Sequence, residues 1–330
     1  MAATAFVLAA GFGTRLRPLT LDRPKPLVPI SGVPALAYSL ALCAQHDHRD
    51  VIVNAHYLAD QLQRWEGEHE GCRVEVHVEE PDILGTGGGL KAVADRLADR
   101  FVVLNADVLH AFDLQALADE VRPAGAAMVL RPSEEAERYG IVAADETGTV
   151  VQLVALAEAP GEGAVPRDTH FTGIHALDRD ALDLVPEGFA CIVRSAYQAL
   201  VPQRRVGSLR ADGVWLDAGD PHAYLEANLS VLRGEVELAL DPWTRARSGQ
   251  RHGRRFGPRP EGVELEGPVW IGAGAVIEPG ARLSHCVIGD GAHVPAGAQL
   301  HEVVAWDGVV VPGSVSRAIV HDTGTWMEQA

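Results

Sequence analysis

The fold is decided by the stretch Phe6-Val-Leu-Ala-Ala-Gly-Phe-Gly-Thr-Arg-Leu-Arg-Pro-Leu-Thr20, which is followed by Pro24-Lys-Pro-Leu27. Its apolar run, Phe6 to Ala10, predicts a buried strand, and the two glycines that follow predict a sharp turn. Because Gly11 and Gly13 have no Cβ atom, backbone N–H groups can approach an anion closely at this turn. We therefore expect a phosphate-binding loop.

The loop is followed by positive charge. Arg15 and Arg17 offer planar forks that match phosphate oxygens, and Lys25 offers a movable point charge. Only two of the 28 Lys and Arg residues are lysines, Lys25 and Lys91, so a lysine at position 25 stands out. The pattern fits neither the dinucleotide fingerprint, which would need a third glycine where Leu16 stands, nor the Walker pattern.

From Leu8 to Leu27 the chain resembles the signature of the sugar-1-phosphate nucleotidyltransferases, Leu-Ala-Ala-Gly-x-Gly-Thr-Arg-Leu-x-Pro-Leu-Thr followed by Pro-Lys-Pro-Leu. The resemblance implies an enzyme that joins an NTP to a sugar 1-phosphate, giving an NDP-sugar and pyrophosphate. It implies catalytic roles for Arg15 and Lys25. It also implies nucleotide-binding roles at the loop, namely for Ala10, Gly11, Gly13, Thr14 and Arg15.

Composition limits the other functions. The 330 residues exceed the usual size of one core, so a large and a smaller domain are expected. A formal charge of −17 argues against nucleic acid and anionic membrane as partners. The four cysteines form no Cys-x-x-Cys pair, which favours reduced thiols in the cytoplasm. We find no apolar run near the roughly 18 residues that a membrane span needs.

Helical and strand patterns alternate after residue 30. The segments 35–45 and 58–65 read as helices, and the segments 51–54, 73–78 and 101–104 read as strands. Strands separated by such helices imply parallel pairing with right-handed crossovers. We therefore predict an α/β fold with a Rossmann-like, doubly wound mixed sheet, whose ligands collect beyond the carboxyl ends of the strands.

A second glycine-rich loop, Leu84-Gly-Thr-Gly-Gly-Gly-Leu90, precedes a helix expected to end near Leu97. Its glycines predict a nearly bare backbone beside which a base can lie, next to a helix N-terminus. The resemblance implies that Gly85 and Thr86 border the nucleotide base. The alternative is a tight turn packed against a neighbouring strand.

Two carboxylates follow apolar strands. Asp107 ends Asn105-Ala-Asp107, and Asp217 lies in Trp215-Leu-Asp-Ala-Gly-Asp-Pro221. The resemblance implies that Asp107 and Asp217 are catalytic and hold Mg²⁺, which takes one or two carboxylates plus phosphate oxygens. The alternative is a role in turns and helix caps, which we prefer for Asp220.

The sugar-binding residues implied by the resemblance are Asn105, Gly140, Thr172 and Gly173. The main departure lies nearby: where the family carries Glu-Lys-Pro, this chain has Ala155-Leu-Ala157, and it has no lysine in the region. A sugar phosphate needs a cation, so we expect Arg167 or another residue to compensate. Otherwise the chain would be a noncatalytic, nucleotide-sugar-binding regulatory homologue.

The last third of the chain changes character. After a helix at 223–232, an Arg- and Pro-rich stretch reads as a linker, and from Val269 apolar residues recur every six positions. Ile271, Ile277 and Leu283 form one run, and the second run is Ile288, Val294 and Leu300. A six-residue period suits a β-helix. The tail resembles the left-handed parallel β-helix that many nucleotidyltransferases carry, and so short a stack needs end caps or a partner subunit.

The predicted organisation is a catalytic domain at 1–235, a linker at 236–262 and a β-helix at 263–330. The Leu84–Leu90 loop together with the tail most resembles the mannose-1-phosphate guanylyltransferases, and this resemblance implies GTP and mannose 1-phosphate as substrates. We expect Mg²⁺ as the cofactor and a homo-oligomer assembled through the β-helix. Uridylyl or thymidylyl transfer to another sugar 1-phosphate stays open. A hexapeptide acyltransferase using His285, His293 or His301 is a remote alternative.

Overall fold

A computed structural model describes residues 2–134, 136–153, 168–251 and 254–328. The chain divides into two compact units. Unit 1 comprises residues 1–11 and 39–215, and unit 2 comprises residues 12–38 and 216–330. Each unit is therefore built from two separate segments of the chain, and each is described by itself below.

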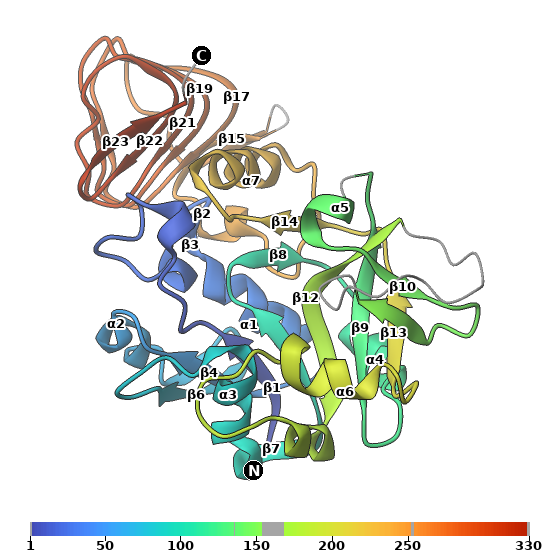
Figure 1. Cartoon of the computed structure of the whole chain (residues 1–330). Coiled ribbons are helices and arrows are strands. Elements are labelled where there is room, and N and C mark those ends of the chain that lie inside the picture. The colour runs from blue at the N-terminus through green and yellow to red at the C-terminus, as the bar shows by residue number, and fades with distance from the viewer. Residues whose placement is uncertain (1, 135, 154–167, 252–253, 329–330) are drawn as a thin grey trace. The chain divides into compact units, whose positions relative to one another are not determined.

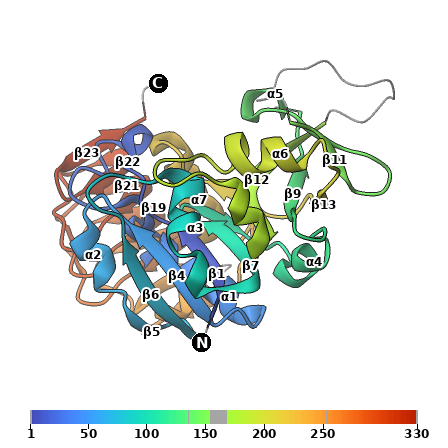
Figure 2. The same cartoon turned by 60° about the horizontal axis from the view of Figure 1, so that its bottom comes forward.

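Unit 1 is built on an eight-stranded sheet with the order β13-β9-β12-β7-β1-β4-β6-β5 (Figures 1 and 2). In that order the strands are β13 (Val206–Arg210), β9 (Ala126–Pro132), β12 (Thr169–Asp178), β7 (Leu97–Asn105), β1 (Ala3–Leu8), β4 (Asp50–Ala55), β6 (Cys72–Val78) and β5 (Gly67–His69). The shorter strands that unit 1 holds outside this sheet are β8 (Val108–His110), β10 (Val142–Ala144) and β11 (Val150–Leu153).

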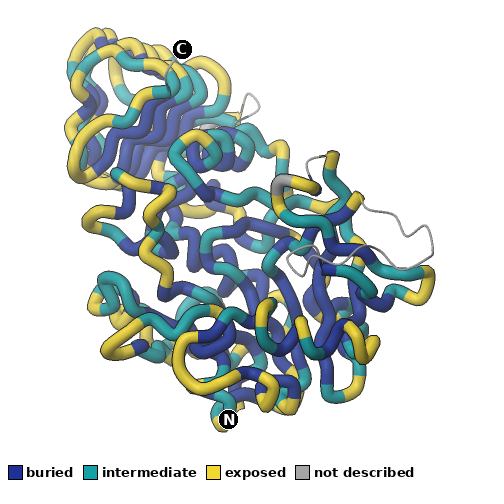
Figure 3. Tube along the Cα trace, in the orientation of Figure 1, coloured by how far each residue is buried: buried dark blue, intermediate teal, exposed yellow. Residues whose placement is uncertain are grey.

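The sheet is mixed. Strand β1 pairs in parallel with β4 and β7, and β4 pairs in parallel with β6. Strand β12 runs antiparallel to both β7 and β9. The prediction of a mixed α/β sheet is thus confirmed. Its central strands are buried (Figure 3), and their apolar side chains include Phe6 on β1 and Val103 on β7. Since β1, β4 and β7 are parallel, their carboxyl ends lie at one edge.

The helices lie close to the predicted segments, with α1 matching both of its predicted bounds. The helices are α1 (Ala35–Gln45), α2 (Ala59–Gln63), α3 (Gly85–Ala92), α4 (Leu114–Asp119), α5 (Ala136–Tyr139), α6 (Gln198–Leu200) and α7 (Pro221–Arg233). One expectation is wrong: the glycines of the second loop do not precede a helix, because they form α3 themselves, and α3 ends at Ala92 rather than near Leu97.

Unit 2 carries a stack of strands in the order β16-β15-β17-β19-β21-β22-β23 (Figure 1). Its members are β16 (Arg254–Phe256), β15 (Ser248–Arg251), β17 (Glu264–Ile271), β19 (Arg282–Ile288), β21 (Gln299–Ala305), β22 (Val315–His321) and β23 (Gly324–Met327). The remaining short strands are β2 (Pro29–Ile30), β3 (Val33–Pro34), β18 (Val276–Ile277) and β20 (His293–Val294), and β14 (Trp215–Asp217) begins where unit 1 ends.

The four central strands of the stack are parallel and in register. Leu283 pairs with Leu265 on one side and with Leu300 on the other, and β18 pairs in parallel with β20. All six predicted inward positions are buried, at most 8% exposed: Ile271, Ile277, Leu283, Ile288, Val294 and Leu300. The six-residue period therefore identified the side chains that fill this core.

Each coil turns a corner at the same place. Gly267, His285, Glu302 and Arg317 all have positive φ angles, between 45° and 60°. A left-handed conformation costs free energy at non-glycine residues, so packing between the coils must hold three of these corners in place.

Both ends of the stack are capped by antiparallel strands. Strand β15 pairs antiparallel with β17, and β16 pairs antiparallel with β15. At the other end β23 pairs antiparallel with β22. The segment 236–262, predicted as a linker, thus contributes two strands and the short helix Pro242–Arg245. The caps also remove the need for a partner subunit to cover bare ends.

The stack packs within unit 2 on the segment that follows the signature. A Cβ atom on Gly32 would collide with the Trp270 ring, so Gly32 lies directly against that indole. The Arg23 guanidinium lies 4.5 Å from the Trp306 ring centroid and pairs with Asp322 at 3.0 Å. The compact unit therefore joins 12–38 to the tail, which differs from the predicted boundary at residue 235.

Helix α7 is fixed to the stack by ion pairs. The Arg317 guanidinium contacts Glu226 of α7, Glu302 of β21 and Glu328, and Arg233 of α7 also pairs with Glu302. The helix begins at Asp220, whose carboxylate accepts a hydrogen bond from the Ala223 N–H at 2.9 Å. Asp220 is thus a helix cap, as we preferred.

None of the helices in the described ranges is long and apolar enough to cross a membrane.

The burial pattern of the stack predicts that two substitutions differ in their effect on the free energy of unfolding. Ile288 is completely buried in the stack, and Val276 is 54% exposed. We expect Ile288→Ala to lower the free energy of unfolding by about 3 kcal/mol, because it removes buried carbon and leaves a cavity. Val276→Ala should change it by less than about 0.5 kcal/mol. Urea unfolding of both variants checks this, and equal losses would contradict the burial pattern.

Candidate functional site

The predicted phosphate loop runs from Gly11, the last residue of the first segment of unit 1, into unit 2. At Gly11 no atom of the described chain lies within 4 Å of the point where a Cβ would stand. Gly13 has φ +61°, and the Thr20 hydroxyl donates to its carbonyl oxygen at 2.8 Å. The loop is therefore held in one conformation by Thr20, and an open space lies beside Gly11.

Arg15 and Asp217 meet at Gly219, within unit 2. A Cβ atom on Gly219 would lie 3.0 Å from a carboxylate oxygen of Asp217 and 3.3 Å from an Nη atom of Arg15. Arg15 is exposed, in the short helix Thr14–Leu16, whereas Lys25 is buried at 9% exposure. The fold thus brings together an arginine and an aspartate that are 202 positions apart, and glycine leaves room for both.

In unit 1 the first strand end lies beside Asn105 and Asp107. Leu8 pairs with Asn105, and the Ala106 N–H donates to the Leu8 carbonyl at 3.1 Å. Gly173, with φ +86°, lies so close to the Asn105 amide that a Cβ would collide with it. The predicted residues Ala10, Asn105, Asp107 and Gly173 therefore share one edge of the sheet.

A buried carboxylate joins this edge to the second glycine segment. Glu79 is 1% exposed and accepts hydrogen bonds from the Asn54 amide and the Leu84 N–H, both at 2.7 Å. The Asn54 carbonyl oxygen in turn accepts from the Ala9 N–H at 2.6 Å. A charge taken out of water must be satisfied by donors in this way. Sequence analysis missed Glu79 and Asn54; the one signal was a carboxylate placed directly after strand 73–78.

The glycines of α3 are required by packing. Cβ atoms at Gly85 and Gly88 would collide with the carbonyl oxygens of Ala190 and Gly188, and a Cβ at Gly87 would lie 3.0 Å from the Ile192 nitrogen. The Ala190 carbonyl also accepts the Gly87 and Gly88 N–H groups. Residues 188–192 therefore lie against part of the backbone that we expected to be nearly bare, and the contact of Gly85 and Thr86 with a base stays a prediction. Thr86 is exposed and accepts from the Ile192 N–H.

The predicted sugar-contacting segment is tied to an aromatic cluster in unit 1. The Thr172 hydroxyl donates to the Val129 carbonyl at 3.1 Å, and the Trp215 indole N–H donates to the Thr172 carbonyl at 3.2 Å. Beside Trp215, the Tyr139 ring stacks on the His170 ring at 4.7 Å. Gly140 follows Tyr139 with φ +91°, and no described atom lies within 4 Å of its Cβ position.

The predicted residues are divided between the units. Asp107 and the sugar-contacting residues belong to unit 1, and Arg15, Lys25 and Asp217 belong to unit 2. Ala155–Ala157 and Arg167 lie outside the described residues. Among those that are described, no group of three or more His, Cys, Asp or Glu side chains could hold a metal ion.

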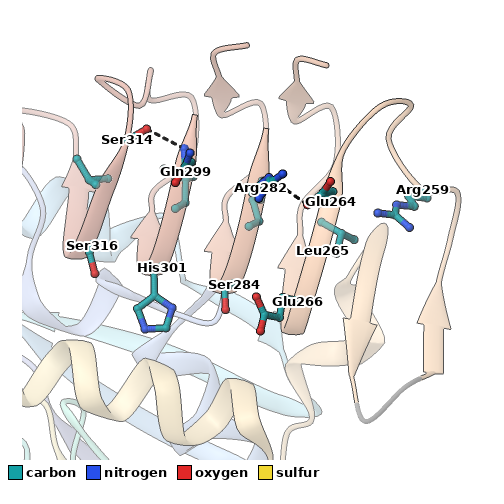
Figure 4. A pocket seen from close by; sticks show the side chains of 13 residues that line it. Arg259, Glu264, Leu265, Glu266, Arg282, Ser284, Gln299, His301, Ser314 and Ser316 are labelled. Atoms are coloured by element: carbon teal, nitrogen blue, oxygen red, sulfur yellow. Dashed lines mark hydrogen bonds and ion pairs between the residues drawn. The ribbon is translucent and has the colours of Figure 1, made fainter. Parts of the chain in front are cut away.

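A separate groove of about 800 Å³ lies on the outer face of the stack (Figure 4). Its arginines are engaged: Arg282 pairs with Glu264 at 3.1 Å, and Arg259 donates to the Val263 carbonyl. His301 also lines the groove. Because its charges neutralise one another, this groove suits a phosphate poorly, and we do not assign it to the site.

The chain is similar to proteins of a known family. The family model described as Nucleotidyl transferase matches residues 4–234. A mannose-1-phosphate guanylyltransferase of Mycobacterium tuberculosis is 32% identical over 295 residues, which cover 86% of this chain and 79% of the relative. A UTP–glucose-1-phosphate uridylyltransferase of a Synechocystis strain is 29% identical over 306 residues, covering 84% and 76%.

Among solved structures, that of HddC from Yersinia pseudotuberculosis matches with a TM-score of 0.55 at 23% identity, covering 68% of this chain and 97% of that one. It shows the fold alone. The family match spans both the glycine signature and the segment around Asp217. The chain therefore belongs to the nucleotidyl transferase family, and within it to the sugar-1-phosphate nucleotidyltransferases.

Proposed function

We propose that this chain transfers a guanylyl group from GTP to mannose 1-phosphate, giving GDP-mannose and pyrophosphate. The name of the Mycobacterium tuberculosis relative, mannose-1-phosphate guanylyltransferase, supports this choice. The name of the Synechocystis relative supports a second candidate, uridylyl transfer from UTP to glucose 1-phosphate. Both reactions have the same chemistry, so the pair of substrates is the part that needs testing.

One observation carries the proposal. The Arg15 guanidinium and the Asp217 carboxylate approach the same point at Gly219, and Arg15 directly follows the glycine loop where we expect a phosphate. An arginine can bind phosphate oxygens through paired hydrogen bonds, and an aspartate beside it can hold a cation that those oxygens also contact.

The reaction needs the two substrates to be positioned and the negative charge of their phosphates to be neutralised. The attacking oxygen belongs to a sugar phosphate and is already ionised, so no general base is needed. In the proposal, the Gly11 to Thr14 backbone and Arg15 hold the β- and γ-phosphates of the NTP. Lys25 neutralises charge that builds at the α-phosphorus. Gly85 and Thr86 border the base.

We propose Mg²⁺ as the cofactor. Asp107 and Asp217 offer carboxylate oxygens, the donors that Mg²⁺ prefers, and two such ligands are the usual number when phosphate oxygens complete the shell. When bound, the ion would stabilise the negative charge of the reacting phosphates.

We further propose that the parallel coils of the tail form a left-handed β-helix and that the chain assembles into a homo-oligomer through it in the cytoplasm. The in-register coils support the first point. The cysteines Cys43, Cys72, Cys191 and Cys286 are free, which suits a reducing compartment. A solution mass equal to one chain would contradict the oligomer.

The first test is pyrophosphate release with Mg²⁺, with five NTPs (GTP, UTP, dTTP, CTP and ATP) against a panel of sugar 1-phosphates. We expect GTP with mannose 1-phosphate to be turned over best. Asp107→Asn and Asp217→Asn should each lower kcat on the order of 100-fold, because each removes a charge held against the reacting phosphates.

Asp220→Asn is the matched control. It changes an aspartate three residues from Asp217, but asparagine caps a helix as well as aspartate does. Activity should therefore stay within about twofold. An equal loss in Asp220→Asn and Asp217→Asn would contradict the metal-binding role. Best turnover with UTP and glucose 1-phosphate would favour the second candidate.

The glycines give a second prediction. Gly11→Ala adds a methyl group where the described chain leaves space, so the thermal midpoint should not change. The methyl group would occupy the phosphate site, and KM for the NTP should rise on the order of tenfold.

In Gly88→Ala the added methyl group would collide with the Gly188 carbonyl, and the substitution should destabilise the fold by about 1–3 kcal/mol. Thermal melts and initial rates check both; an unchanged KM in Gly11→Ala would count against the loop.

A further inference from the structure

Arg131 of unit 1 lies beside an aromatic cluster, and no carboxylate of the described residues pairs with it. Arg131 is on β9, directly opposite His170 on β12. Its Nε atom is buried and finds no hydrogen-bond partner among the described residues. Its guanidinium carbon lies 5.8 Å from the centroid of the Trp215 ring. An inward-facing cationic group with an unsatisfied donor is costly unless something else supplies the acceptor.

The arginine on the next strand is the useful contrast. Arg210 on β13 binds both oxygens of Asp168, at 3.2 and 2.6 Å. Within the described part of the chain Arg131 on β9 has no comparable ion pair, although β9 lies directly beside β13 in the sheet. Among the described residues, the fold thus pairs Arg210 with a carboxylate and gives Arg131 no such partner.

Arg131 lies against two rings of a three-ring cluster, those of His170 and Trp215, and Tyr139 is the third ring. Tyr139 stacks on His170 with 27° between the ring planes, and the Trp215 ring stands edge-on to both, at 5.4 and 5.1 Å. His170 is completely buried, and burial, with a smaller contribution from the Arg131 charge, lowers the pKa of its imidazole. The imidazole is therefore neutral near pH 7 and does not compete with Arg131 for an anion.

The cluster is held beside the segment proposed to contact the sugar. The Trp215 indole donates to the Thr172 carbonyl, and Gly140 next to Tyr139 has open space at its Cβ position. Tyr139 remains 42% exposed, at the end of α5 (Figure 1). An exposed aromatic face beside an arginine is suited to a ligand that has both an apolar ring face and an anionic group.

We propose that Arg131 binds the phosphate of the sugar 1-phosphate, with Tyr139 covering one face of the sugar ring. The inference rests on the proposed function and deepens it. The chain has no lysine between Lys91 and its C-terminus, so another residue has to supply the positive charge that a sugar phosphate needs. Arg131 supplies the missing positive charge from a different strand, as a substrate-binding residue. The guanidinium fork can hold two phosphate oxygens at once.

The test compares Arg131→Gln, Arg131→Lys, Arg210→Gln and Arg167→Gln with the unchanged chain. Initial rates are measured with the best NTP and sugar 1-phosphate, each varied in turn. For Arg131→Gln we expect KM for the sugar phosphate to rise about 10- to 100-fold, with KM for the NTP unchanged. Arg131→Lys should recover part of the loss because it keeps the charge.

Arg210→Gln is the matched control and should leave both KM values within about twofold. The thermal midpoint of Arg131→Gln should not fall, since Arg131 has no ion pair to lose among the described residues. An unchanged KM for the sugar phosphate in Arg131→Gln overturns the proposal, and so does a rise of KM in Arg167→Gln alone.

Titration calorimetry with mannose 1-phosphate and glucose 1-phosphate separates this inference from the proposed function. Binding by the unchanged chain that is lost in Arg131→Gln, without any turnover, would support Arg131 and contradict the proposed reaction. Turnover with normal binding in Arg131→Gln would do the reverse. If the unchanged chain bound neither sugar phosphate, the assignment of Arg131 would be wrong.

Discussion

The edge of the sheet in unit 1 depends on one buried carboxylate. Glu79 holds the Asn54 amide and the Leu84 backbone, and Asn54 holds the Ala9 backbone. These bonds join the β4 residue Asn54 to the segments that follow β1 and β6. The Ala9 and Leu84 N–H groups in those segments would otherwise lose their acceptors, so the loss of this carboxylate would loosen both segments together.

The sequence could predict most of the elements because their signals are local. The bounds of α1 follow from its helical period, and the core positions of the tail follow from a six-residue repeat. The antiparallel orientation of β12 could not be predicted, because a buried strand shows the same apolar run whichever way it points. Glycines are ambiguous in a similar way: the close packing of residues 188–192 against those of α3 could not be predicted, because a glycine run is typical both of a ligand loop and of a close chain contact.

The residues of the candidate site also divide into those that the sequence could predict and those that it could not. Residues in the two motifs, such as Arg15 and Asp217, could be found from the sequence because their spacing is characteristic, and the structure brings them to one glycine. Glu79 had only a weak signal, its place directly after a predicted strand, and nothing in the sequence marked Arg131. The importance of Glu79 comes from partners elsewhere in the chain, and that of Arg131 from the lack of an acceptor for its Nε atom among the described residues. A single buried donor without an acceptor is visible only after the chain has folded.

The two antiparallel caps have a consequence for how the tail can change in length. Strands β15 and β16 close one end of the stack and β23 closes the other, while the coils between them repeat in register. A coil added or removed in the middle would leave both caps with the same kind of neighbour. The tail is therefore modular: its coil number can drift between homologues without creating an open, aggregation-prone strand edge.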